Sequence, residues 1–218
     1  MTTMNPDEMV FRLIAATILV MVGLTRDGVR FYIYLRQRPR RLPVEILRES
    51  LENVRNTADD LMATTPMALL ALACFGGIVA FIFAPEKIAW SSVALPDWAR
   101  FVGAAVALSG ALGEMWALLY LGRQYSGLLR VRWDHMLIRQ GPYAWVRHPM
   151  YSFGMPFLLG LGFLAANWFV ILSGVAAVTL VMLLRTPREE ALMRKAFGHS
   201  YKMYARCTGR FLPRRRTG

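Results

Sequence analysis

A short stretch in the second half of the chain holds several side chains that could bind a charged ligand. It reads Gly141-Pro142-Tyr143-Ala144-Trp145-Val146-Arg147-His148-Pro149-Met150-Tyr151. The Gly-Pro pair predicts a turn, and Pro149 is suited to the first position of a helix, where its missing N–H is not needed. Arg147 and His148 should then lie at the helix N-terminus. Unpaired N–H groups and the positive end of the helix dipole attract carboxylates and phosphates there.

A second polar group follows about 40 residues later. Arg185 comes directly after an apolar run, and Glu189 and Glu190 open a segment that predicts a short helix ended by Gly198. Because the two glutamates are adjacent, we expect one to face a ligand site and the other to face solvent. Arg185 carries a permanent charge and a planar donor fork, which suits it to hold a carboxylate or phosphate.

These polar groups are separated by long apolar runs. Apolar residues make up 56% of the 218 and charged residues 18%, against about 25% charged in a soluble domain. This composition excludes a disordered chain, and two cysteines exclude a disulfide scaffold. A membrane-spanning helix needs about 20 apolar residues, and five runs approach that length: 9–25, 66–84, 98–122, 149–166 and 168–184. We therefore expect an all-α integral membrane protein with about five transmembrane helices.

The last two apolar runs are separated only by Asn167, which predicts a helical hairpin. Both legs of a hairpin return to the same face of the membrane. We therefore expect His148 and Tyr151 to lie near Arg185 and Glu189, despite their separation in the sequence.

The distribution of charge predicts the topology. The net charge is +12, and 23 of the 26 Lys and Arg residues fall in segments 26–65, 122–148 and 185–218. Cytoplasmic loops collect such residues, so these segments are expected in the cytoplasm and the N-terminus outside. The charge is thus explained by the membrane and its lipids, and we expect no nucleic-acid partner.

We expect two regions in the chain. Residues 1–97 hold two spans and a cytoplasmic amphipathic helix at about 44–62, and residues 98–218 hold the remaining three spans and a cytoplasmic C-terminal tail. Glu114 lies within the third span, where ionisable groups are costly and usually functional. It either has such a function or pairs with a polar group between helices.

Four segments, in this order along the chain, resemble the isoprenylcysteine carboxyl methyltransferase family. They are the residues from Gly141 to Tyr151, then Arg185, Glu189-Glu190 and Phe197-Gly198-His199-Ser200-Tyr201. The wider group includes phospholipid N-methyltransferases. The resemblance covers about residues 113–213. It implies a membrane-embedded enzyme that uses S-adenosylmethionine at the cytoplasmic end of its last spans. The implied acceptor is lipidic or a small hydrophobic molecule, with a carboxylate favoured.

The resemblance also implies roles for individual residues. The family's cofactor contacts fall on His135, Met136, Leu137, Ile138, Tyr143, His148, Pro149, Met150, Tyr151 and Glu189. The substrate-side arginine falls on Arg185, while Arg147 and Glu190 are additional candidates. A glutamine of the family's site, upstream of position 135, has no clear counterpart. No metal is expected.

Other functions stay open at this stage. A phospholipid N-methyltransferase or a thiol S-methyltransferase would need to remove a proton from its acceptor, whereas a carboxylate acceptor would not. NADPH-dependent sterol-type reductases share an Arg-His-Pro-x-Tyr stretch but usually have Asn where this chain has Met150. A transporter would be expected to carry polar residues at mid-membrane, and only Glu114 offers one.

Overall fold

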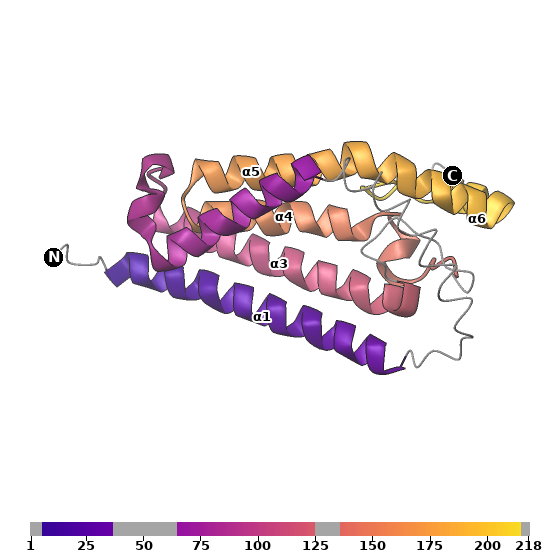
Figure 1. Cartoon of the computed structure of the whole chain (residues 1–218), viewed down its shortest axis with the longest axis horizontal. Coiled ribbons are helices and arrows are strands. Elements are labelled where there is room, and N and C mark those ends of the chain that lie inside the picture. The colour runs from indigo at the N-terminus through magenta and orange to yellow at the C-terminus, as the bar shows by residue number, and fades with distance from the viewer. Residues whose placement is uncertain (1–5, 37–64, 125–135, 215–218) are drawn as a thin grey trace.

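The structure is a computed structural model that describes residues 6–36, 65–124 and 136–214, and its described parts are mainly helical (Figure 1). The helices are α1 (Pro6–Arg36), an unlabelled helix at Thr65–Phe83, α3 (Asp97–Leu121), α4 (Pro149–Leu164), α5 (Trp168–Leu180) and α6 (Thr186–Cys207). Short 3-10 turns lie at Pro85–Lys87, Ala89–Ser91, Gly122–Gln124 and Gly141–Ala144. The all-α prediction is confirmed.

The predicted spans coincide with helices. Within the described ranges, four helical stretches are long and apolar enough to cross a membrane: Asp7–Val29, Thr65–Phe83, Asp97–Leu121 and the continuous stretch Trp168–Cys207. Helix α4 is apolar but shorter, at 16 residues. Helix α1 extends beyond the predicted 9–25 at both ends. The amphipathic helix predicted at 44–62 lies outside the described residues.

Helices α5 and α6 form one continuous helical stretch, joined by a π-helical turn at Val181–Arg185. Its 40 residues, at about 1.5 Å each, span about twice the thickness of the hydrocarbon layer. The polar α6 therefore extends beyond the membrane. The predicted helix end at Gly198 is confirmed, because Gly198 has a non-helical backbone (φ 51°) that kinks α6 there, and a second helical segment of α6 then runs on to Cys207. Beyond the kink, Tyr201 and Tyr204 are buried, so α6 still has an apolar face to pack.

The helices α1, α3, α4 and α5 lie side by side (Figure 1). Helices α3 and α4 approach closely because glycines line their contact. A Cβ on Gly110 of α3 would lie 2.5 Å from the backbone nitrogen of Phe157 in α4, and a Cβ on Gly160 of α4 would collide with the backbone of Ala107. Small residues are the usual means by which membrane helices pack backbone against backbone.

The turn between α4 and α5 is held by Asn167, which is 1% exposed. Its Oδ1 accepts a hydrogen bond from the Val170 backbone N–H (3.1 Å), and its Nδ2 donates to Ser91 Oγ (2.8 Å). The predicted hairpin is therefore confirmed.

The same end of the bundle holds a buried arginine. Arg100 of α3 donates to both carboxylate oxygens of Glu8 (2.6 and 3.1 Å) and to the Leu164 carbonyl (3.1 Å). These contacts join α1, α3 and α4 at this end of the bundle, and at the other end Tyr151 of α4 contacts Glu189 of α6.

Candidate functional site

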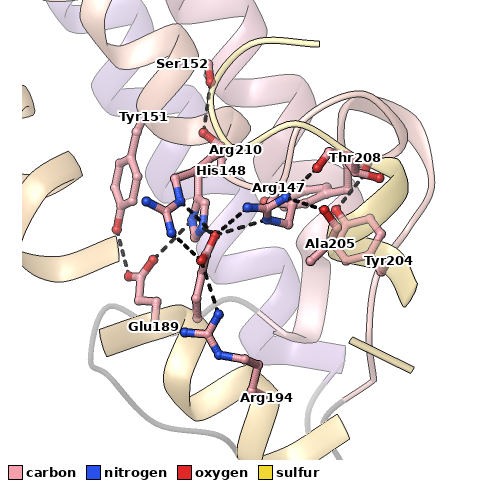
Figure 2. A network of polar contacts seen from close by, with 12 residues as sticks. Arg147, His148, Tyr151, Ser152, Glu189, Arg194, Tyr204, Ala205, Thr208 and Arg210 are labelled. Atoms are coloured by element: carbon pink, nitrogen blue, oxygen red, sulfur yellow. Dashed lines mark hydrogen bonds and ion pairs between the residues drawn. The ribbon is translucent and has the colours of Figure 1, made fainter. Parts of the chain in front are cut away.

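The candidate site lies where α4 begins, at the end of the bundle opposite Asn167. Pro149 is the first residue of α4, as predicted, and His148 immediately precedes it. Tyr151 lies in the first turn of α4, and the first turns of α6 face it (Figure 2). The hairpin thus brings together residues that lie about 40 positions apart.

Glu189 of α6 is held by three side chains. Tyr151 Oη donates a hydrogen bond to Glu189 Oε1 (2.7 Å), and Arg185 Nε donates to the same oxygen (2.9 Å). The other oxygen, Oε2, lies 3.4 Å from His148 Nδ1. The rings of His148 and Tyr151 are stacked, with centroids 5.8 Å apart and an interplanar angle of 9°. The structure therefore places the four residues together, as the hairpin argument expected.

Glu190 contacts the other side of His148 and is only 2% exposed. His148 Nε2 lies 3.3 Å from Glu190 Oε1, and Arg147 Nε donates to that oxygen (3.0 Å). Arg210 donates from Nη2 to Oε2 (2.7 Å) and from Nε to Oε1 (3.1 Å). Our expectation that one of the two glutamates faces solvent is wrong. Successive helical side chains point about 100° apart, and the two ring nitrogens of His148 allow it to contact both.

The electrostatics of the three groups are coupled. Burial by itself lowers the pKa of His148. The hydrogen bonds and negative charges of Glu189 and Glu190 have a larger, opposite effect, so the pKa of His148 is raised above its ordinary value. Burial raises the pKa of Glu189, but contacts with His148, Tyr151 and Arg185 outweigh that effect and lower it. The pKa of Glu190 is likewise lowered, against the effect of burial, by His148, Arg210 and Arg147. The arrangement therefore favours a protonated histidine between two carboxylates.

The segment after α6 packs against the residues before α4. Val146 and Gly209 form a parallel β-bridge, and the N–H of Arg147 donates to the Gly209 carbonyl (2.8 Å). We call residues 208–213 the C-terminal strap. His148 N–H donates to the Arg210 carbonyl (3.1 Å), and the Phe211 ring lies 5.8 Å from that of His148. The strap therefore forms one wall of the site.

Sequence reasoning missed the strap, and it treated Arg210 as one of many basic tail residues. The side-chain oxygen of Gln124 accepts a hydrogen bond from the Met136 backbone N–H (3.1 Å).

The remaining predicted residues are spread around this cluster. Tyr143 is buried, and its carbonyl accepts a hydrogen bond from Tyr204 Oη (2.7 Å). Pro149 is buried, while Met150 lines a hollow between α1 and α3. The described hydrogen bonds and ring contacts do not join Met136, Leu137 or Ile138 to His148, and His135 lies outside the described residues. Their assignment to a cofactor site stays a prediction.

The chemistry of the cluster suits an organic ligand. Glu189 offers a carboxylate to hydroxyl or ammonium groups, and the stacked rings of His148 and Tyr151 offer aromatic faces to a cation or a base. In the described part of the chain, no group of three or more His, Cys, Asp or Glu side chains is arranged to hold a metal ion.

Comparisons with known proteins cover the half of the chain that contains this cluster. Residues 98–200 match the family model described as phospholipid methyltransferase. A probable protein-S-isoprenylcysteine O-methyltransferase of Oryza sativa is 27% identical over 115 residues, which are 52% of this chain and 60% of that protein. The cobalt-zinc-cadmium resistance protein CzcN of Cupriavidus metallidurans is 32% identical over 105 residues, 47% of this chain and 44% of that one.

A solved structure supports the fold. That of the eukaryotic intramembrane Ras methyltransferase ICMT has a TM-score of 0.53 and 24% identity, and the match covers 67% of this chain and 51% of that one. The prediction of an all-α integral membrane protein is confirmed, as is the resemblance of this half of the chain to isoprenylcysteine methyltransferases. The aligned region spans less than two thirds of the rice protein, and the strap lies outside the range matched by the family model.

Proposed function

We propose, on the premise that residues 98–200 are related to the phospholipid methyltransferase family, that this protein is an integral membrane S-adenosylmethionine-dependent methyltransferase. The acceptor is a lipidic or small hydrophobic molecule, most readily one with a carboxylate. The observation that carries the proposal is the position of Glu189, whose carboxylate is held by Tyr151, Arg185 and His148 at the N-terminal end of α4.

The side chains present fit the cofactor. Glu189 can accept hydrogen bonds from hydroxyl or ammonium groups, and the faces of His148 and Tyr151 can contact a sulfonium or a purine. These three residues would hold the cofactor, which supplies an activated methyl group together with its leaving group. The protein's main task is then to align the acceptor.

Arg185 is the residue best placed to hold the acceptor. Its Nε hydrogen bond to Glu189 fixes the orientation of the guanidinium next to the site. A guanidinium binds carboxylates and phosphates with defined geometry. A carboxylate acceptor is already ionised at neutral pH, so the site needs no general base. The isoprenylcysteine O-methyltransferases among the relatives make an S-prenylated cysteine with a free carboxylate the first acceptor to try.

We further propose the topology and domain division. The site faces the cytoplasm and the N-terminus lies outside, since basic residues gather at the site end of the bundle, as cytoplasmic segments require. Residues 98–218 form the methyltransferase core, and residues 1–97 form an N-terminal two-span region.

The experiment that tests the reaction class is calorimetry of S-adenosylhomocysteine binding to the detergent-solubilised protein, with NADPH as the comparison ligand. We expect S-adenosylhomocysteine to bind and NADPH not to bind. Glu189→Ala and His148→Ala should abolish binding, whereas Arg185→Ala should retain binding and lose turnover. Unchanged affinity in both of the first two variants would contradict the placement, and binding of NADPH alone would move the protein to the reductases.

A further inference from the structure

The C-terminal strap contacts His148 and the first turn of α4 directly. The Arg210 carbonyl accepts a hydrogen bond from the His148 N–H (3.1 Å), and the Phe211 ring lies 5.8 Å from the His148 ring. The Phe211 carbonyl accepts a hydrogen bond from Ser152 Oγ (2.6 Å), one turn further along α4. The strap therefore holds both the backbone and the ring of the histidine.

The course of the strap is fixed at Gly209. The carbonyl of Gly209 accepts a hydrogen bond from the Arg147 N–H (2.8 Å), next to the bridge with Val146. A Cβ on Gly209 would collide with the Leu212 carbonyl oxygen, so the chain turns tightly there. The strap is thus a defined element that can hold the Arg210 side chain in one place.

Arg210 also acts on His148 through Glu190 (Figure 2). Its guanidinium spans the carboxylate, with Nη2 2.7 Å from Oε2 and Nε 3.1 Å from Oε1. Arg147 and His148 contact Oε1, and Arg194 lies farther away, 3.8 Å from Oε2. Among the described residues, Arg210 is therefore the one that donates a hydrogen bond to Oε2, and it fixes the rotation of the carboxylate.

The rotation of this carboxylate decides how firmly His148 is held. Glu190 Oε1 lies 3.3 Å from His148 Nε2, a long contact that a small rotation of the carboxylate would break. Glu190 is buried, so water does not readily replace a lost donor. The Arg210 side chain is instead 45% exposed and adds little to the packed interior. Its removal should therefore disturb the orientation of Glu190 and His148 more than the stability of the protein.

We propose that Arg210 is a positioning residue for the methyl-transfer site, and that through Glu190 and the strap backbone it fixes the His148 ring in the orientation that contacts the cofactor. The role requires a guanidinium, because the ammonium of lysine cannot hold both carboxylate oxygens in one plane. The strap lies beyond residue 200, where the match to the family model ends. The inference rests on the proposed function for the contact between His148 and the cofactor, whereas the effect of Arg210 on the histidine ring does not.

The first test compares variants of the full-length protein in detergent by calorimetry with S-adenosylhomocysteine and by thermal unfolding. Arg210→Lys and Arg210→Ala should each weaken binding about tenfold and lower the unfolding midpoint little, since a half-exposed arginine contributes little to stability. Arg214→Ala is the matched control, because that arginine follows the strap and donates to the Arg206 carbonyl instead (2.8 Å). It should keep wild-type affinity. Wild-type affinity in Arg210→Lys would overturn the proposal, because the charge alone would then suffice.

A spectroscopic test follows the histidine ring itself. The chain contains three histidines, so in protein labelled with carbon-13 histidine the ring signal that is missing from His148→Gln identifies His148. Arg210→Lys and Arg210→Ala should shift or broaden this signal, and Arg214→Ala should leave it unchanged. An unchanged His148 signal in both Arg210 variants would contradict the proposal. Failure of the wild-type protein to bind S-adenosylhomocysteine would instead count against the proposed function, and the His148 signal separates the two results.

Discussion

Tyr151 at the start of α4 donates a 2.7 Å hydrogen bond to Glu189 of α6, 38 positions later in the chain. The hydroxyl shares the carboxylate oxygen Oε1 with Arg185 Nε. Two elements therefore fix one carboxylate at the point where the membrane helix begins. Any ligand that Glu189 binds meets an oxygen pair whose orientation is already set.

Tyr151→Phe removes this hydrogen bond and keeps the aromatic ring. We expect the affinity for S-adenosylhomocysteine to fall about tenfold, equivalent to about 1.4 kcal/mol, because Glu189 would lose one of the donors that fix its orientation. Calorimetry measures this directly. Tyr120→Phe is the matched control, because the structure shows no hydrogen bond for the Tyr120 hydroxyl among the described residues and its ring contacts Trp116. Equal losses in the two variants would contradict a specific role for Tyr151.

His148 should make the stability of the protein depend on pH. Its pKa is raised in the folded state, so its contribution is complete below its ordinary value of 6.5 and is lost as the pH rises through the higher folded value. The pKa values of Glu189 and Glu190 are lowered, so their contributions are present above their ordinary 4.5 and lost as the pH falls. All three groups are charged together between these limits.

Thermal unfolding in detergent at several pH values tests this dependence. We expect the difference in unfolding midpoint between wild type and His148→Gln to be largest near pH 6 and to shrink towards pH 9. His199→Gln, at an exposed position of α6, should show no such trend. A difference that stays constant over this range would mean that folding does not shift the pKa of His148 and that its side chain contributes by packing alone.

The parts of the fold that follow from local composition could be predicted. Long apolar runs located the helices, and Asn167 located the turn because a polar residue between two spans has few other places to be satisfied. The meeting of His148 with Glu189 followed from the hairpin alone. These inferences depend only on segment length and on which residues interrupt the apolar pattern.

The parts that depend on tertiary contacts could not be predicted. Arg210 is one of ten basic residues after the fifth span, and nothing in its local sequence distinguishes it, yet it contacts a glutamate that is 2% exposed. The π-helical turn at Val181–Arg185 changes the helical phase just before Glu189 and Glu190. Counting by an ideal helical period therefore could not assign the faces of the two glutamates.

Arg147 and Arg210 contact the same carboxylate but should differ in importance. Arg147 is largely buried and also donates to the carbonyls of Ala205 and Thr208, whereas the Arg210 side chain is 45% exposed. Arg147→Ala should destabilise the protein by about 3–5 kcal/mol, because it leaves a buried carboxylate poorly compensated. Arg210→Ala should cost about 1 kcal/mol or less.

Thermal denaturation of both variants in detergent gives the comparison. The double variant Arg147→Ala/Glu190→Gln should recover part of the loss, because the uncompensated charge is gone. A double variant no more stable than Arg147→Ala would show that the cost comes from the lost carbonyl contacts.

The close contact of α3 with α4 should be required to position the site. A Cβ on Gly110 would lie 2.5 Å from Phe157 N and 2.8 Å from Phe153 O, and these backbone atoms can move only if α4 moves. Gly110→Ala should therefore destabilise the protein by about 1–3 kcal/mol, as overpacking does. Because α4 carries Tyr151, the same displacement should also weaken S-adenosylhomocysteine binding.

Gly76→Ala provides the control for Gly110→Ala, since nothing lies within 4 Å of a Cβ at that position. It should leave both the unfolding midpoint and ligand affinity unchanged or slightly improve stability, because alanine favours a helix over glycine by about 1 kcal/mol. Thermal unfolding and calorimetry of the pair separate the two effects. A Gly110→Ala protein of normal stability but reduced affinity would place a ligand directly at the α3–α4 contact. If Gly110→Ala lowers both the unfolding midpoint and the ligand affinity, the displacement of α4 accounts for both losses.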